Sequence, residues 1–117
     1  MRIYLAGGFY SDWKDKVKQG APSHLYYDPE DGSKQNAVCD FVPGDLRGID
    51  WSELVLVYKQ KTNPTACGLS AEMGYAYAKG KPIVLVDDND RIDSFLAGLS
   101  QRIYTNLDSA IEYLRGL

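Results

Sequence analysis

The chain has 117 residues, of which 44% are hydrophobic, and its formal charge is −3. These values fit one compact domain that spans residues 1–117. Its 13 Lys and Arg residues are scattered along the sequence, which disfavours a nucleic acid-binding face. The longest apolar runs, Leu54–Tyr58 and Ile83–Val86, are much shorter than the ~20 residues that a membrane-spanning helix needs, so we expect no contact with a membrane.

The cysteines and the histidine are too dispersed to form a metal or disulfide framework. Cys39 and Cys67 stand apart and belong to no CxxC pair, and His24 has no second histidine to act with. At the N-terminus, a single Arg2 and a short apolar stretch do not form the pattern of a secretory signal. We therefore expect reduced thiols, no bound metal and a cytoplasmic location.

Short apolar segments alternate with helix-forming segments along the whole chain. Strands are predicted at Arg2–Ala6, His24–Tyr27, Leu54–Tyr58, Ile83–Val86 and Arg102–Tyr104. Helices are predicted at Trp13–Lys18, Asp45–Glu53, Gly68–Lys79, Ile92–Leu99 and Leu107–Leu114. We interpret the polar stretch Asp28–Gly44 as a long loop on the substrate side. The order predicts an α/β fold, a single-domain Rossmann-like (flavodoxin-like) sheet of five parallel strands between helix layers.

In such a sheet, ligands bind beyond the carboxyl ends of the strands, so the first loop is a candidate site. It combines a flexible turn with aromatic rings suited to stacking on a flat ligand, and its candidate substrate-binding residues are Gly7, Gly8, Phe9, Tyr10 and Trp13. For any one of these rings, packing against the core is an equally good interpretation. We expect Asp12 to cap the helix that follows.

The same loop partly imitates a dinucleotide-binding fingerprint. Asp28 lies twenty residues after Gly8, where that fingerprint places an acidic residue, and we retain it as a candidate substrate contact. However, Ser11 or Asp12 stands where a third glycine would let the backbone approach a pyrophosphate. The sequence also lacks the P-loop pattern. We therefore predict no cofactor.

Glu72 is the most informative acidic residue in the sequence. It follows the predicted strand Leu54–Tyr58 and lies near the start of the helix that begins at Gly68, where backbone N–H groups and the helix dipole favour an ionised carboxylate. A carboxylate held ionised there can act as a nucleophile. The alternative is that an acidic residue in a first turn simply stabilises the helix, and position alone favours that alternative.

Three sequence blocks occur in one order: residues 3–9 (IYLAGGF), 44–57 (GDLRGIDWSELVLV) and 68–82 (GLSAEMGYAYAKGKP). Together they resemble the nucleoside 2-deoxyribosyltransferase family, and they span most of the chain. The resemblance implies transfer of a 2-deoxyribosyl group from a deoxynucleoside to a second nucleobase, without a cofactor. It equally implies relatives that hydrolyse deoxynucleoside 5′-monophosphates.

The resemblance also implies three catalytic residues. Glu72 matches the family nucleophile in the G-x-x-x-E-x-G-Y-A segment and would form a glycosyl-enzyme intermediate. Tyr4 matches the tyrosine that holds this glutamate, although a tyrosine buried in a sheet is the simpler interpretation. Asp45 matches the acid that contacts the nucleobase and would protonate it as it leaves. As an alternative or additional role, Asp45 would cap the helix that follows it.

One stretch of the sequence departs from the family pattern, and another matches the stretch by which relatives complete a neighbouring subunit's site. The family commonly has a polar substrate contact six residues before the nucleophile, where this chain has Ala66, so Thr65 is the candidate substitute, with Gly68 beyond it. Relatives complete the site with a polar residue from a neighbouring subunit, and Asp93 or Ser94 lies in the matching stretch.

We therefore expect a homo-oligomer, at least a dimer, in which the apolar side chains of Phe95, Leu96 and Leu99 pack against a second copy of the chain. A non-catalytic nucleotide sensor, or an N-glycosidase acting on another nucleotide such as NAD, remains an alternative function.

Overall fold

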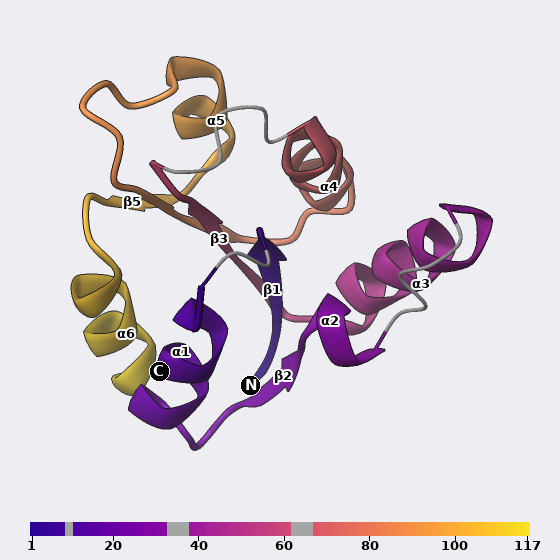
Figure 1. The fold of residues 1–117 in the computed structure, drawn as a ribbon, viewed down its shortest axis with the longest axis horizontal. Coiled ribbons are helices and arrows are strands. Elements are labelled where there is room, and N and C mark those ends of the chain that lie inside the picture. Colours follow the sequence, from indigo (N-terminus) through magenta and orange to yellow (C-terminus); the bar gives the residue numbers. More distant parts are fainter. Residues whose placement is uncertain (9–10, 33–37, 62–66) are drawn as a thin grey trace.

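The computed structural model describes residues 1–8, 11–32, 38–61 and 67–117. The described residues form a parallel five-stranded sheet with the strand order β2-β1-β3-β4-β5 and helices on both faces (Figure 1). The strands are β1 (Arg2–Gly7), β2 (Leu25–Tyr27), β3 (Leu54–Lys59), β4 (Ile83–Asp87) and β5 (Arg102–Tyr104). The helices are α1 (Trp13–Gly20), α2 (Pro29–Gly32), α3 (Val38–Trp51), α4 (Cys67–Ala78), α5 (Ser94–Leu99) and α6 (Leu107–Arg115). The predicted fold class is confirmed.

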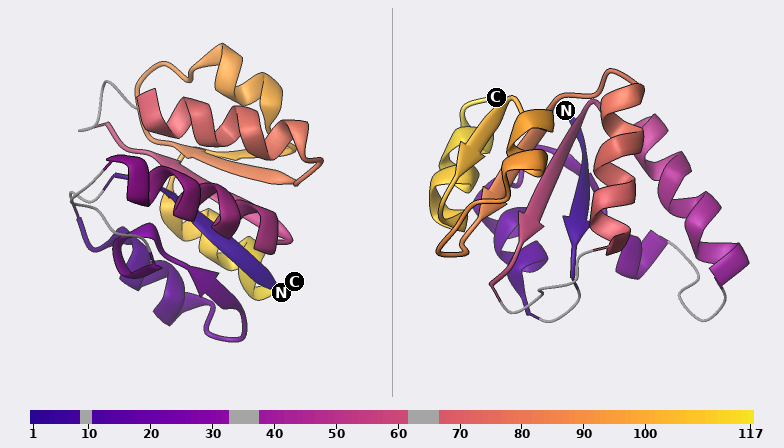
Figure 2. Two further views of the ribbon diagram at one scale, coloured as in Figure 1. Left: turned by 90° about the vertical axis from the view of Figure 1, so that its right-hand side faces the viewer. Right: turned by 90° about the horizontal axis from the view of Figure 1, so that it is seen from above.

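Strands β1 and β3 lie in the middle of the sheet and are buried on both faces. Their register pairs Tyr4 with Val55 and Leu5 with Leu56. Because successive side chains of a strand point to opposite faces, Leu5 and Leu56 join the core beneath α1 and α6, whereas Tyr4 and Val55 join the core beneath α3, α4 and α5. Figure 2 shows these two helix layers on opposite sides of the sheet.

The strand order reverses between β1 and β3. In an open parallel sheet, the carboxyl ends of the strands at this switch point border a crevice, which is the usual place for a ligand. The chain leaves β1 at Gly7 and leaves β3 at Lys59, so the residues beyond these positions border that crevice. The fold thus places the candidate site at the loops after β1 and β3.

The interpretation of 28–44 as a loop was wrong. The structure forms α2 directly after Asp28 and begins α3 at Val38, so Asp45 lies inside α3 and does not cap a helix. Pro43 explains the error, because a proline inside a helix removes one hydrogen bond and usually marks a helix boundary. Here the apolar side of α3 is anchored on the sheet by the fully buried Ile49, which offsets that cost.

The expected cap of α1 was also wrong. Asp12 precedes α1, but its side chain makes no capping hydrogen bond and instead lies 3.8 Å from the ammonium of Lys16. Both side chains are exposed, so this pair adds little stability. In the described ranges, no helix is long and apolar enough to cross a membrane.

Candidate active site

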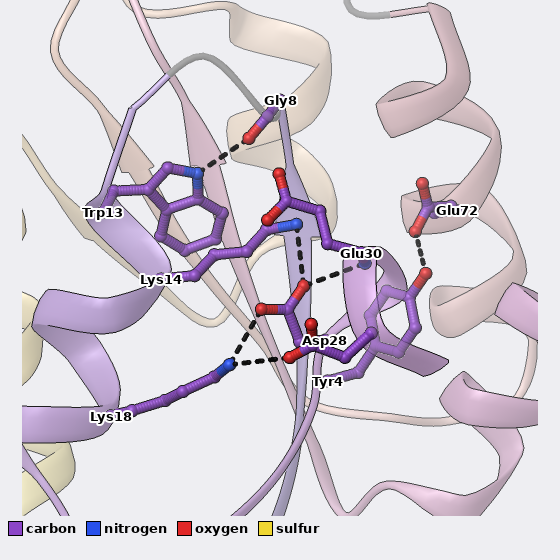
Figure 3. A network of polar contacts seen from close by, with 9 residues as sticks. Tyr4, Gly8, Trp13, Lys14, Lys18, Asp28, Glu30 and Glu72 are labelled. Atoms are coloured by element: carbon purple, nitrogen blue, oxygen red, sulfur yellow. Dashed lines mark hydrogen bonds and ion pairs between the residues drawn. The ribbon is translucent and has the colours of Figure 1, made fainter. Parts of the chain in front are cut away.

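Tyr4 and Glu72 meet beneath the α3–α5 layer. Tyr4 lies in β1 with its side chain fully buried, and Glu72 projects from α4, the helix that follows β3. The Tyr4 hydroxyl donates a hydrogen bond of 2.5 Å to Oε2 of Glu72 (Figure 3). Tyr4 is therefore both a buried sheet residue and a partner of the glutamate, and the two interpretations of its role hold together.

Burial, and not the helix N-terminus, dominates the charge state of Glu72. Burial, together with the negative charge of Asp45, raises its pKa to about 7. The hydrogen bond from Tyr4 and the positive charge of Lys14 act in the opposite direction. Because α4 begins at Cys67, Glu72 lies beyond the first turn, and the expectation that the helix dipole keeps it ionised was wrong.

The hydroxyl of Tyr4 stays protonated at any physiological pH. Burial raises its pKa well above the usual range, and the neighbouring carboxylates of Glu72 and Asp45 raise it further. Tyr4 is thus a permanent hydrogen-bond donor to Glu72. Since Asp45 changes the pKa of both residues, the structure brings the three sequence-predicted catalytic residues into one electrostatic neighbourhood.

Tyr27 is a residue of this site that the sequence reasoning missed. Its ring stacks on that of Tyr4, with 5.5 Å between centroids and 16° between planes. Its hydroxyl donates to the carbonyl oxygen of Gly44 at 3.1 Å, and a Cβ on Gly48 would lie 2.7 Å from its ring. The two glycines, one helical turn apart, are the sequence signal that a bulky side chain packs against this face of α3.

Trp13 is part of the core and is not free to stack on a ligand. It is 1% exposed, packs edge-on against Tyr58, and donates from Nε1 to the carbonyl oxygen of Gly8 at 2.9 Å (Figure 3). Gly7 is required here because an added Cβ would lie 2.7 Å from the Trp13 ring and 2.9 Å from the Tyr58 carbonyl oxygen. The stacking hypothesis therefore concerns Phe9 and Tyr10, which lie outside the described residues.

Asp28 is held by two lysines of α1. Its carboxylate lies 3.1 Å from Nζ of Lys14 and 2.8 Å from Nζ of Lys18, and its Oδ1 accepts from the backbone N–H of Glu30 (Figure 3). Burial raises the pKa of Asp28, but the hydrogen bond from Lys18 and the charge of Lys14 outweigh burial and hold the pKa below its usual value. These contacts tie α1, β2 and α2 together behind the site.

The residues predicted to reach a neighbouring subunit lie at the start of α5. Asp93 caps this helix, because its Oδ1 accepts from the N–H groups of Phe95 and Leu96, each at 3.0 Å. Ser94 is exposed, and Phe95 is 76% exposed. The expectation that Leu96 meets another copy was wrong, since it is 3% exposed within the chain's own core.

Leu99 is partly buried against the same core, and its contact with a second copy stays a prediction. Gly68 lies exposed in the first turn of α4, with open space around the position of an added Cβ. Thr65 and Ala66 lie outside the described residues. Among the side chains that the structure places, no group of three or more His, Cys, Asp or Glu residues could hold a metal ion.

Solved structures with a similar fold include two enzymes. A 2-deoxyribosyltransferase from Bacillus psychrosaccharolyticus is 18% identical, has a TM-score of 0.80, and the match covers 97% of this chain and 92% of that one. A CMP N-glycosidase from Clostridium botulinum is 20% identical, with a TM-score of 0.69 and coverage of 97% and 98%. At these identities the likeness shows the fold alone.

The sequence itself carries the family assignment. No curated protein sequence matches the chain. The sequence profile of the family described as nucleoside 2-deoxyribosyltransferase matches residues 3–101, which is most of the chain. The protein therefore belongs to the nucleoside 2-deoxyribosyltransferase family.

Proposed function

We propose that the protein breaks the N-glycosidic bond of a deoxynucleoside or its 5′-monophosphate and transfers the 2-deoxyribosyl group through a covalent intermediate on Glu72. The observation that carries the proposal is the hydrogen bond from the buried Tyr4 to Glu72, beside Asp45, in a member of this family. A partly buried carboxylate with a pKa near 7 is a stronger nucleophile than an exposed one and is still ionised in a large fraction of molecules at neutral pH.

The reaction has two displacements at C1′ of the sugar. In the first, a carboxylate oxygen of Glu72 forms a bond to C1′, the C1′–N bond breaks, and its electron pair leaves with the base. In its protonated form Asp45 donates this proton to the departing base and thereby lowers the barrier, and the attacking nitrogen or water returns a proton to Asp45 in the second displacement. In the second, a nitrogen of another base, or a water molecule, attacks C1′ and releases the carboxylate, so the configuration at C1′ is retained.

Tyr4 would position the nucleophile in both steps. Its hydroxyl fixes Oε2 of Glu72, whereas Oε1 accepts no hydrogen bond from the part of the chain that the structure places. Oε1 is therefore the oxygen that we assign to the attack on C1′. Fixed orientation of a reacting group accounts for a large part of the barrier reduction in such reactions.

The substrate would lie in the crevice between the ends of β1 and β3. Gly7 and Gly8 would line it together with Phe9 and Tyr10, while Thr65 and Gly68 would close it from the side of α4. Within this proposal Trp13 and Asp28 act behind the site, because both are engaged inside the chain.

A neighbouring copy would complete the site through α5. Phe95, with 76% of its surface exposed, and Tyr77 of α4, with 60%, are large apolar side chains that a second copy would cover. Because Asp93 is engaged in capping its own helix, Ser94 is the better candidate for a contact with the partner's substrate. The partners in this proposal are thus a small-molecule substrate, a nucleobase and a second copy of the chain.

The test is incubation with a panel of deoxynucleosides and their 5′-monophosphates, with and without an added base, followed by chromatography. Exchanged base identifies transfer, and free base with free sugar identifies hydrolysis. The Glu72→Gln variant should release no base, whereas Glu112→Gln, at an exposed position of α6, should behave as the wild type. Binding without turnover in the wild type would instead support a non-catalytic nucleotide sensor. In a parallel incubation with NAD, released nicotinamide would support an N-glycosidase that acts on that nucleotide.

A further inference from the structure

Tyr27 lies between Tyr4, which holds Glu72, and α3, the helix that carries Asp45. On one side, its ring stacks on Tyr4 at 5.5 Å. On the other side, α3 approaches so closely that only a glycine fits at position 48, where an added Cβ would be 2.7 Å from the Tyr27 ring. The thickness of one aromatic ring therefore sets the gap between β1 and this part of α3.

The hydroxyl of Tyr27 adds a directional contact to this packing. It donates to the carbonyl oxygen of Gly44, the residue that directly precedes Asp45, at 3.1 Å. The ring also packs at a tilt against Trp51 at the end of α3, with 6.5 Å between centroids. Contacts at Gly44, Gly48 and Trp51 thus hold three successive turns of α3 against a single side chain of β2.

We infer that Tyr27 is a positioning residue that sets the place of Asp45 relative to the Tyr4–Glu72 pair. This inference rests on the proposed function, since it concerns the step in which Asp45 protonates the leaving base. Tyr27 touches neither reacting atom. It acts through Gly44 on the acid and through ring stacking on the partner of the nucleophile.

Two substrates with different leaving groups can distinguish this role of Tyr27 from a general loss of structure. A nucleobase leaves poorly unless it is protonated, whereas p-nitrophenolate leaves well without a proton. A change that displaces Asp45 should therefore slow the cleavage of a deoxynucleoside and spare the cleavage of p-nitrophenyl 2-deoxyriboside. Misplacement of Glu72, or partial unfolding, would slow both substrates alike.

The variants are Tyr27→Phe, which keeps the ring and removes the Gly44 contact, and Gly48→Ala, which pushes on the ring from α3. We expect kcat for the deoxynucleoside to fall about tenfold in each, the scale of one hydrogen bond, and kcat for the activated substrate to change less than twofold. Asp45→Asn should show the same pattern with a larger loss.

The chain offers a matched control for each change. Tyr26→Phe removes a tyrosine hydroxyl from the same strand, one that donates to the Ala21 carbonyl oxygen at 2.6 Å away from the site. Gly116→Ala, after the end of α6, adds a methyl whose nearest neighbour is the Tyr113 carbonyl oxygen at an ordinary contact distance of 3.6 Å. Equal losses on both substrates, or wild-type rates in Tyr27→Phe and Gly48→Ala, would overturn the inference. If the wild type cleaves neither substrate, it is the proposed function that fails.

Discussion

Tyr4 and Glu72 are separated by 68 positions in the sequence, yet the hydroxyl of the first donates a hydrogen bond of 2.5 Å to the carboxylate of the second. The contact exists because β1 and β3 are neighbours in the sheet and α4 returns over them. It connects a permanent donor to a carboxylate whose pKa lies near neutrality. Two properties of the protein follow from this pair and can be measured.

Tyr4→Phe should shift the pH dependence of the reaction. The hydrogen bond from Tyr4 lowers the pKa of Glu72, so its removal raises that pKa above 7. Because the nucleophile must be ionised, the pH at which activity is half-maximal should rise, and the rate at pH 7 should fall roughly tenfold. A series of kcat measurements from pH 5 to 9 checks this.

The control is Tyr58→Phe, which removes another hydrogen bond from a tyrosine to a carboxylate. The Tyr58 hydroxyl donates to Asp88, the residue after β4, at 2.6 Å. This variant should keep the wild-type midpoint. An unchanged midpoint in Tyr4→Phe as well would mean that the hydroxyl does not act on Glu72.

Glu72→Gln should stabilise the protein at alkaline pH and not at acidic pH. The folded state raises the pKa of Glu72 from 4.5 to about 7, so it binds the proton more tightly than the unfolded chain. The free energy of unfolding therefore falls as the pH rises from about 4.5 to 7. The Gln side chain, which cannot ionise, escapes this loss, and at pH 8 we expect a gain of about 2–3 kcal/mol.

Chemical denaturation at pH 4 and pH 8 measures both values. Because a neutral Glu72 and a Gln both accept from Tyr4, the two proteins should be nearly equal at pH 4. A variant that is less stable than the wild type at pH 8 would contradict the raised pKa. The expected gain would mean that the charged form of Glu72, which the reaction needs, lowers the free energy of unfolding of the wild type.

Asp28→Asn should be the most destabilising of these changes. It leaves the ammonium of Lys14, which is 3% exposed, without its negative partner, and breaking a buried pair costs about 3–5 kcal/mol. Because the folded state lowers the pKa of Asp28, its contribution is complete above the unfolded value of 3.8 and disappears as the pH falls through the folded value. Denaturation midpoints at pH 7 and pH 3 should show this loss and its decrease.

Asp12→Asn provides the comparison, since the pair of Asp12 with Lys16 is exposed on both sides. We expect it to change the free energy of unfolding by less than about 1 kcal/mol. If Asp28→Asn were equally mild, the buried cluster would not be what ties α1 to the end of β2.

Local patterns sufficed to predict the sheet. The uninterrupted apolar run Leu54–Tyr58 is typical of a strand covered on both faces, and the structure buries it as β3. The predicted helix Gly68–Lys79 is found as α4, which ends just before Gly80, a residue with a φ of +71°. The contents of the site were harder to predict. The pKa of Glu72 depends on its burial and on the charge of Asp45 in α3, and neither can be read from the position of Glu72 in its own helix.

The errors share the same origin, because each concerns where the chain packs and not what it forms locally. Pro43 suggested a helix boundary, but the packing of α3 on the sheet carries the helix through it. Trp13 suggested a stacking surface, but α1 turns its ring into the core. The role of Tyr27 could not be predicted from its own strand, because it depends on contacts with Gly44 and Gly48 of α3.

Phe95→Glu should separate the copies of the chain. A charge at a side chain that is 76% exposed costs the free monomer little but cannot be buried in an interface. We expect the sedimentation coefficient to fall to that of a monomer and base release to fall with it. Leu117→Glu, at the exposed C-terminal residue, should change neither. A wild-type protein that is monomeric and active at the assay concentration would contradict the shared site.

The central claim is that Glu72 carries the sugar between the two displacements. The most direct measurement is rapid acid quenching of the protein with a deoxynucleoside, followed by digestion and mass spectrometry of the peptide that contains Glu72. We predict a mass increase of one 2-deoxyribosyl group on Glu72, which disappears when an acceptor base is added and is absent in Glu72→Gln. Base release at the wild-type rate by Glu72→Gln, or turnover with inverted configuration at C1′ and no modified peptide, would contradict the claim.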